Sequence, residues 1–299
     1  MNKGLKKVVA ATMALSAMLN IGTVGTAKTV KKSQIGLHSS YTNRDVAVRF
    51  AKKIAGHGYW DMPEDMQIQA HWCAAFTKVL YGHDKESGYN TVDNTIRYVT
   101  QEGGSFITDK TQEPHVGDLA IYNETAYGET DTYKTYDHIG IIYGTMQVDG
   151  VWWVKTIEGN SIDVNWEKDW GMKACDVDEW TYFYASDPVR FEDRHVVQYP
   201  AKKARQGQIV GWLSPRTVRK YYTVGDINGD GSINIADLVV IRRAFEDKQQ
   251  HHGVLHNSYS DKYGVAELFY RCDLNGDGNF SKSDVSRLTE YITFGAETF

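Results

Sequence analysis

The residue best suited to covalent chemistry in the first two thirds of the chain is Cys73. Apolar residues after it have helical spacing and a glycine follows them, which predicts a short helix with Cys73 in its first turn (Ala74, Phe76, Val79 and Leu80, then Gly82). At a helix start, N–H groups and the helix dipole favour the thiolate, which is the nucleophilic form of cysteine. Taken alone, a cysteine is more often a buried structural residue.

A candidate partner for this thiol begins the first of two predicted strands, 138–144 and 151–158. The strands flank residues 148–150 (Val-Asp-Gly), and this pattern predicts a β-hairpin. The first strand starts with His138. A histidine at a strand start is by itself usually a hydrogen-bonded surface residue, but beside a thiol it can act as a general base.

The register of this hairpin decides where two further polar residues, Glu158 and Asn160, lie. With a three-residue loop at 148–150, Asn160 lies opposite His138 and Glu158 opposite Gly140, all on one face of the sheet. A strict two-residue Asp-Gly turn shifts the register by one residue and sends both side chains to the other face.

With the favourable register, these residues are the parts of a thiol hydrolase: a nucleophile, a base and a group that orients the base. Cys73 would attack an amide carbonyl and His138 would hold the proton. Glu158 or Asn160 would fix the imidazole tautomer. The backbone N–H of Cys73 could donate to the developing oxyanion.

The C-terminal part contains an internal repeat, in which the segment 226–237 recurs at 273–284. Each copy has oxygen-bearing side chains at positions 1, 3, 5 and 12 and glycine at position 6, which is the arrangement of a calcium-binding loop. Position 7 offers a backbone carbonyl. The repeat therefore predicts two structural Ca²⁺ ions, with the ligands Asp226, Asn228, Asp230, Ser232 and Asp237 in one loop and Asp273, Asn275, Asp277, Asn279 and Asp284 in the other.

The segments around these loops give weaker signals. An amphipathic helix is predicted after each loop and no helix is predicted before either. Residues 191–221 are rich in lysine and arginine, which favours a solvated connector. The stretch between the loops carries His251, His252 and His256; these side chains could bind a metal, but a solvated linker is the preferred interpretation.

Length and composition limit the function classes. The chain has 299 residues, 41% hydrophobic residues and a formal net charge of −5, enough for about two domains with real cores. The acidic balance argues against nucleic acid and anionic lipid as partners. Three cysteines, Cys73, Cys175 and Cys272, are too few and too scattered for a disulfide scaffold.

The first 27 residues have the pattern of an export signal. A basic start is followed by an apolar run and by a small-residue cleavage site at 25–27. The apolar run is short for a membrane span, and no other segment qualifies as one. We therefore expect a secreted, soluble protein without a membrane span.

The motifs of the first part occur in a specific order: W-C-A-A-F at Cys73, then P-x-x-G-D-L-A-I-Y, then D-H-I-G-I-I-Y-G at His138 and I-E-G-N-S at Glu158. Together they resemble the CHAP family of cysteine, histidine-dependent amidohydrolases/peptidases. The resemblance implies a papain-like α+β fold. It also implies that Cys73 is the nucleophile, His138 the base, and Glu158 and Asn160 the E-x-N pair, in an enzyme that hydrolyses amide bonds, most often in bacterial peptidoglycan.

The repeat at the C-terminus resembles a type I-like dockerin, because position 12 is Asp rather than the Glu of an EF-hand and no convincing helix precedes either loop. The spacing between the loops is longer than in typical dockerins and has a ruminococcal look. The resemblance covers about 224–294. It implies a calcium-dependent module that binds a cohesin domain of a cellulosome scaffoldin.

The sequence thus predicts an α+β, papain-like catalytic domain followed by a small all-α calcium-binding dockerin. The predicted division is a signal peptide at 1–27, a CHAP-like domain at 36–190, a connector at 191–221 and a dockerin at 222–295. The predicted function is a secreted amide hydrolase of peptidoglycan, docked on a cell-surface cellulosome. Alternatives are a peptidase acting on proteins and a non-catalytic binding component. The cleaved bond, the orienting residue, the particular cohesin and the oligomeric state are left open.

Overall fold

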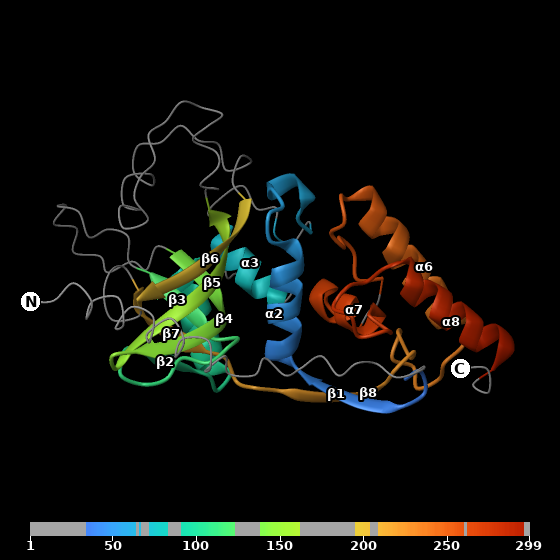
Figure 1. The fold of residues 1–299 in the computed structure, drawn as a ribbon, viewed down its shortest axis with the longest axis horizontal. Coiled ribbons are helices and arrows are strands. Elements are labelled where there is room, and N and C mark those ends of the chain that lie inside the picture. The colour runs from blue at the N-terminus through green and yellow to red at the C-terminus, as the bar shows by residue number, and fades with distance from the viewer. Residues whose placement is uncertain are drawn as a thin grey trace, which may run out of the picture.

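The structure is a computed structural model that describes residues 34–63, 66, 72–82, 91–122, 138–161, 195–203, 209–259 and 262–295. The predicted export signal and Cys175 lie outside the described residues. The described chain is a mixed α/β fold with a C-terminal helical region that contains the two predicted calcium loops (Figure 1).

An antiparallel sheet of six strands forms the first part, in the order β2-β7-β3-β4-β5-β6. The strands are β2 Ser105–Ile107, β3 Leu119–Tyr122, β4 His138–Val148, β5 Val151–Ser161, β6 His195–Lys203 and β7 Ile209–Ser214.

Three helices accompany the sheet: α2 Asn43–Ile54, α3 Cys73–Leu80 and α4 Val92–Gln101, with a short 3₁₀ turn at Tyr59–Asp61. The helix predicted around Cys73 is present, and Cys73 is its first residue. α3 packs on β4 and β5, and α2 packs on the other side of α3. All residues of α3 are buried, the polar Thr77 and Lys78 included, and the other six are apolar.

The C-terminal part consists of α6 Ile235–Gln250, α7 Val265–Cys272 and α8 Lys282–Phe294. Before these helices, β8 Arg219–Thr223 pairs antiparallel with β1 His38–Thr42 near the start of the described chain. The predicted all-α dockerin at 222–295 therefore begins within a strand. The absence of a helix before the second loop was also a wrong expectation, because α7 ends at Cys272, directly before that loop.

Residues 191–221 do not form the expected connector, because they supply β6, β7 and part of β8. β7 lies inside the sheet between β2 and β3, and its Ile209, Trp212 and Leu213 are fully or almost fully buried. The charged residues flank this apolar strand and do not make it a linker. Burial of the apolar run outweighs the charge of its neighbours.

The histidine-rich stretch between the loops is not a solvated linker either. His252 Nδ1 lies 2.6 Å from Asp61 Oδ1, and His256 Nε2 lies 2.8 Å from the Asp61 carbonyl oxygen. The His251 ring stacks on His256 with centroids 3.7 Å apart. This stretch therefore attaches the C-terminal part to the turn that follows α2.

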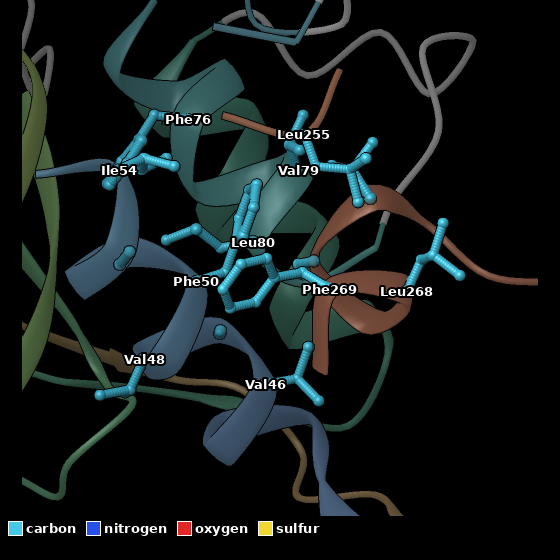
Figure 2. Packing of buried hydrophobic residues seen from close by; sticks show 14 of the residues in the cluster. Val46, Val48, Phe50, Ile54, Phe76, Val79, Leu80, Leu255, Leu268 and Phe269 are labelled. Atoms are coloured by element: carbon cyan, nitrogen blue, oxygen red, sulfur yellow. The ribbon is translucent and has the colours of Figure 1, made fainter. Parts of the chain in front are cut away.

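One hydrophobic core joins the two parts of the chain. α2 stands between α3 on one side and α7 on the other (Figure 1). Figure 2 shows Phe50 of α2, Leu80 of α3 and Phe269 of α7 together, and the Phe50 and Phe269 ring centroids are 5.7 Å apart. The continuous core predicts that both parts unfold together.

Phe269→Ala tests this shared core. Removing a buried aromatic ring costs about 3–5 kcal/mol of unfolding free energy, and we expect a single, less stable unfolding transition for the whole chain. Denaturant unfolding followed by circular dichroism and tryptophan fluorescence measures it. Phe294→Ala, which removes a ring that is 67% exposed, is the matched control. Two separate transitions, with the sheet domain unaffected by Phe269→Ala, would contradict the expectation.

Candidate active site and calcium loops

The hairpin that carries His138 and Glu158 combines the two alternative registers. Val148 pairs with Val151, so the turn has two residues, and Asp149 and Gly150 have the left-handed φ values of 50° and 73° that such a turn requires. Of the two alternatives that the sequence left open, the hairpin therefore has the strict two-residue Asp-Gly turn.

A bulge then produces the register that a three-residue loop would have set. The pairing shifts between Ile142 and Gly144, which leaves Tyr143 as an extra residue, and Ile141 pairs with Ile157 beyond it. Continued by one residue, this register brings Glu158 beside Gly140. An added Cβ at Gly140 would collide with Glu158 Cγ. Glycine at this position therefore leaves the room that the Glu158 side chain occupies over β4.

His138 and Glu158 form a buried pair. His138 Nε2 lies 3.1 Å from Glu158 Oε2, and both side chains are only 1% exposed. The other carboxylate oxygen, Oε1, accepts hydrogen bonds of 2.6 Å from the hydroxyl groups of Tyr122 and Thr156. A buried carboxylate is stable as an anion only when its oxygens are paired in this way.

Cys73 approaches the same imidazole from α3. Its side chain is 2% exposed, and the thiol is a hydrogen-bond partner of the His138 ring. α3 can lie this close to β5 because residue 159 is a glycine. A Cβ at Gly159 would collide with the Phe76 side chain of α3.

The electrostatics of the site favour a charged imidazole. Burial by itself lowers the pKa of His138, but the hydrogen bonds and charges of Cys73 and Glu158 outweigh it and raise the pKa to about 10. An imidazolium beside the sulfur is the kind of partner that favours a thiolate in cysteine nucleophiles. This is the electronic arrangement that nucleophilic attack by cysteine requires.

The structure brings Cys73, His138 and Glu158 together, and Glu158 is the group that contacts Nε2. Asn160 belongs to β5, but its side chain lies outside what the structure describes, so its role stays a prediction.

Sequence reasoning missed Tyr122 and Thr156. Tyr122 pairs directly with His138 across β3 and β4, and Thr156 precedes Glu158 by two residues and therefore lies on the same face of β5. The period-two alternation of strands could have identified Thr156. Tyr122 could be identified only from the pairing of β3 with β4, which the sequence does not show.

Each predicted calcium loop is closed by its aspartate at position 12. In the first loop, Asp237 Oδ1 accepts the N–H groups of Ile227 at 2.7 Å and Asn228 at 3.0 Å. In the second loop, Asp284 Oδ1 accepts those of Leu274 at 2.9 Å and Asn275 at 3.1 Å.

The same two aspartates also lie in the first turn of the helices that follow the loops. Each completes a capping box with the residue before its helix, Asn234 or Ser281. Burial raises the pKa of both Asp237 and Asp284, against several N–H donors that lower it.

The first loop offers an oxygen that suits a cation. Asp226 Oδ1 is buried and has no hydrogen-bond partner among the described residues. In the same part of the chain, no three His, Cys, Asp or Glu side chains form a metal site by themselves. Amide and backbone oxygens would therefore complete the ligand set, which is typical of calcium.

Comparison with known families identifies the C-terminal part. A model of the dockerin type I domain matches residues 224–293. Type I dockerins typically bind calcium, and dockerin domains occur in extracellular cellulosome components. The match supports docking to a cellulosome through a cohesin partner.

The other comparisons add no relatives. No CHAP domain is detected, and no curated protein or solved structure matches the chain. Among the residues described, every helix is too short or too polar to span a membrane.

The pKa of His138 gives a direct test of the site geometry. Because Glu158 stabilises the charged ring, Glu158→Gln should lower the pKa from about 10 toward the ordinary value of about 6.5. Tyr122→Phe should lower it less, because the carboxylate remains. NMR titration of ¹³C-labelled histidine rings measures the change, with the signal assigned by its loss in His138→Gln. An unshifted titration in Glu158→Gln would show that the pair does not set the charge.

Proposed function

We propose that the chain is a secreted cysteine hydrolase that cleaves amide bonds and is held on a cellulosome scaffold by its dockerin. The observation that carries the enzymatic part is the buried contact of His138 with Glu158 at 3.1 Å and with the Cys73 thiol. The order of motifs supports it, because that order resembles CHAP enzymes with a papain-like fold.

Attack begins when the Cys73 sulfur bonds to the amide carbonyl carbon, whose oxygen takes the negative charge. The backbone N–H of Cys73, in the first turn of α3, would donate to that oxygen. The His138 imidazolium then gives its proton to the leaving nitrogen and the C–N bond breaks. The product of this step is a thioester on Cys73 and a free amine.

Hydrolysis of the thioester uses the same groups in reverse. Neutral His138 takes a proton from water, the hydroxide bonds to the thioester carbon, and the C–S bond breaks. The products are a carboxylic acid and the restored thiolate–imidazolium pair. Glu158 stabilises His138 in its charged state throughout.

The substrate class follows from the resemblance: peptide bonds of bacterial peptidoglycan, with protein peptide bonds as the alternative. One observation favours a non-catalytic component instead, namely the burial of Cys73. Against it stands the buried charged pair, because desolvating an imidazolium and a carboxylate is costly and a purely structural core gains little from it.

For the dockerin, we propose one structural calcium ion in each loop. Oxygens of Asp226, Asn228, Asp230, Ser232 and Asp237 would hold the first ion, and oxygens of Asp273, Asn275, Asp277, Asn279 and Asp284 the second. Such ions neutralise the carboxylates that each loop gathers and couple metal binding to folding.

Loss of the catalytic pair should abolish amide hydrolysis. Cys73→Ala and His138→Ala each remove one member of a unit, which typically costs several orders of magnitude in rate. Release of new amines from defined peptidoglycan fragments, with circular dichroism to confirm folding, measures the effect. Full activity of Cys73→Ala would refute the assignment.

A thiol-labelling control separates the hydrolase from a silent component. Cys272 is equally buried, and burial raises its pKa well above the usual range. Iodoacetamide near neutral pH should therefore modify Cys73 and not Cys272, and His138→Ala should remove that preference. Equal inertness of both thiols in the wild type would favour the non-catalytic component.

Cohesin binding should use one face of the dockerin. On α6, Ile235 is 63% exposed and Val239 is 44% exposed, beside exposed Arg242 and Arg243. The corresponding face of α8 starts with Lys282 and Ser283 and carries Glu290. One partner patch cannot complement both faces equally, because a buried charge mismatch costs several kcal/mol.

Exchanging the two pairs tests this preference. Replacing 235–236 by Lys-Ser should weaken cohesin binding measured by calorimetry in calcium, and replacing 282–283 by Ile-Ala should leave it unchanged. If each single exchange is harmless and only their combination weakens binding, the dockerin docks in both orientations.

A further inference from the structure

The two calcium loops have nearly the same hydrogen bonds but differ at position 1. Asp226 Oδ2 accepts the Gly231 N–H at 3.1 Å, and its Oδ1 has no hydrogen-bond partner among the described residues. Both oxygens of Asp273 are engaged. Oδ1 accepts from the Asp277 N–H at 3.1 Å and Oδ2 from the Gly278 N–H at 2.9 Å.

The additional partner of Asp273 is a cation from the other part of the chain. Arg49 Nη1 of α2 lies 2.7 Å from Asp273 Oδ2, whose side chain is fully buried. The same guanidinium lies 4.3 Å from the centroid of the Tyr270 ring, which fixes its position. One helical turn further on, Lys53 Nζ donates to Asn279 Oδ1, at position 7 of the loop, at 3.2 Å.

The cations near the first loop donate to its backbone oxygens, and Lys262 also acts electrostatically on the Asp230 carboxylate at position 5. Arg271 Nη1 donates to the Asp226 carbonyl at 2.9 Å, and Lys262 donates to the Gly229 carbonyl. Neither is a hydrogen-bond partner of the Asp226 carboxylate. Among the described residues, the position-1 carboxylate thus forms an ion pair with a protein cation in the second loop and not in the first.

We propose that Arg49 makes the second loop the weaker calcium site, and that calcium in this loop weakens the attachment of the dockerin to α2. The inference rests on the proposed calcium sites and not on the hydrolase. Two cations that share one buried carboxylate repel each other strongly, because the surroundings screen them poorly. The coupling is reciprocal: Arg49 lowers calcium affinity by the same factor by which calcium weakens the Arg49–Asp273 pair.

The functional consequence is an attachment that depends on calcium concentration. At low calcium the first loop fills, and α2 retains the second loop through Arg49 and Lys53. At higher calcium the second loop also fills, and the dockerin is held to α2 by its apolar contacts with less help from charge. A catalytic domain on a scaffold would gain freedom of movement under those conditions.

Calorimetric titration of the full chain with calcium chloride tests the proposal. Asp230→Ala, an exposed position-5 ligand, silences the first loop so that the second is measured alone. In this background, Arg49→Met should tighten the dissociation constant about tenfold, within the range typical of coupling between sites. Arg49→Lys, which keeps the charge, should tighten it less.

Two controls isolate the effect. With the second loop silenced by Asp277→Ala, Arg49→Met should leave the first loop's affinity unchanged. Arg97→Met, which removes an arginine whose described hydrogen bond goes to Asn94 on the same helix, should change neither loop. Denaturant unfolding provides a second readout: Arg49→Met should destabilise the chain more in chelator than in saturating calcium.

Unchanged or weaker calcium binding at the second loop in Arg49→Met would overturn the inference, because Arg49 would then be neutral or would preorganise the loop. The same result would not argue against the proposed calcium sites. An absence of calcium binding in the unmodified chain would instead refute the sites and this inference together.

Discussion

The contact between His138 Nε2 and Glu158 Oε2, 3.1 Å long and almost fully buried, is the constraint on which the sheet domain depends. Two opposite charges are stable in such a place only if every remaining polar atom has a partner. The hydroxyl groups of Tyr122 and Thr156 donate hydrogen bonds to the Glu158 carboxylate, and the Cys73 thiol is a hydrogen-bond partner of the His138 ring. The bulge in β4 and the glycine at position 140 follow from the same demand, since both allow the carboxylate to reach the imidazole.

The second organising element is α2, which packs both on α3, the helix that carries Cys73, and on α7 of the dockerin. Phe50 continues the core into α7, and Arg49 on the same helix reaches the second calcium loop. Docking module and sheet domain are therefore parts of one folded body. A change in the calcium loops has a short physical route to the helix beside Cys73.

Local sequence patterns predicted individual helices, strands and loops. The hairpin register and the place of β7 in the sheet depend on long-range pairing, which local patterns do not show. The helix start at Cys73, the hairpin and the repeated loops followed from spacing alone. The Asp-Gly turn favoured one register and the active site another, and the bulge at Tyr143 that reconciles them has no local signal. In the same way, the lysines and arginines of 191–221 concealed β7, whose burial depends on β2 and β3. Arg49 was beyond prediction, because its partner Asp273 is 224 residues away in sequence.

The most direct test of a thiol hydrolase is the covalent intermediate itself. A defined peptidoglycan fragment is mixed with the chain, the reaction is quenched with acid within its first turnovers, and peptides are mapped by mass spectrometry. The account predicts an acyl group of substrate mass on the peptide that contains Cys73, and none in Cys73→Ala. Hydrolysis of the fragment without any acyl group on Cys73 would contradict it.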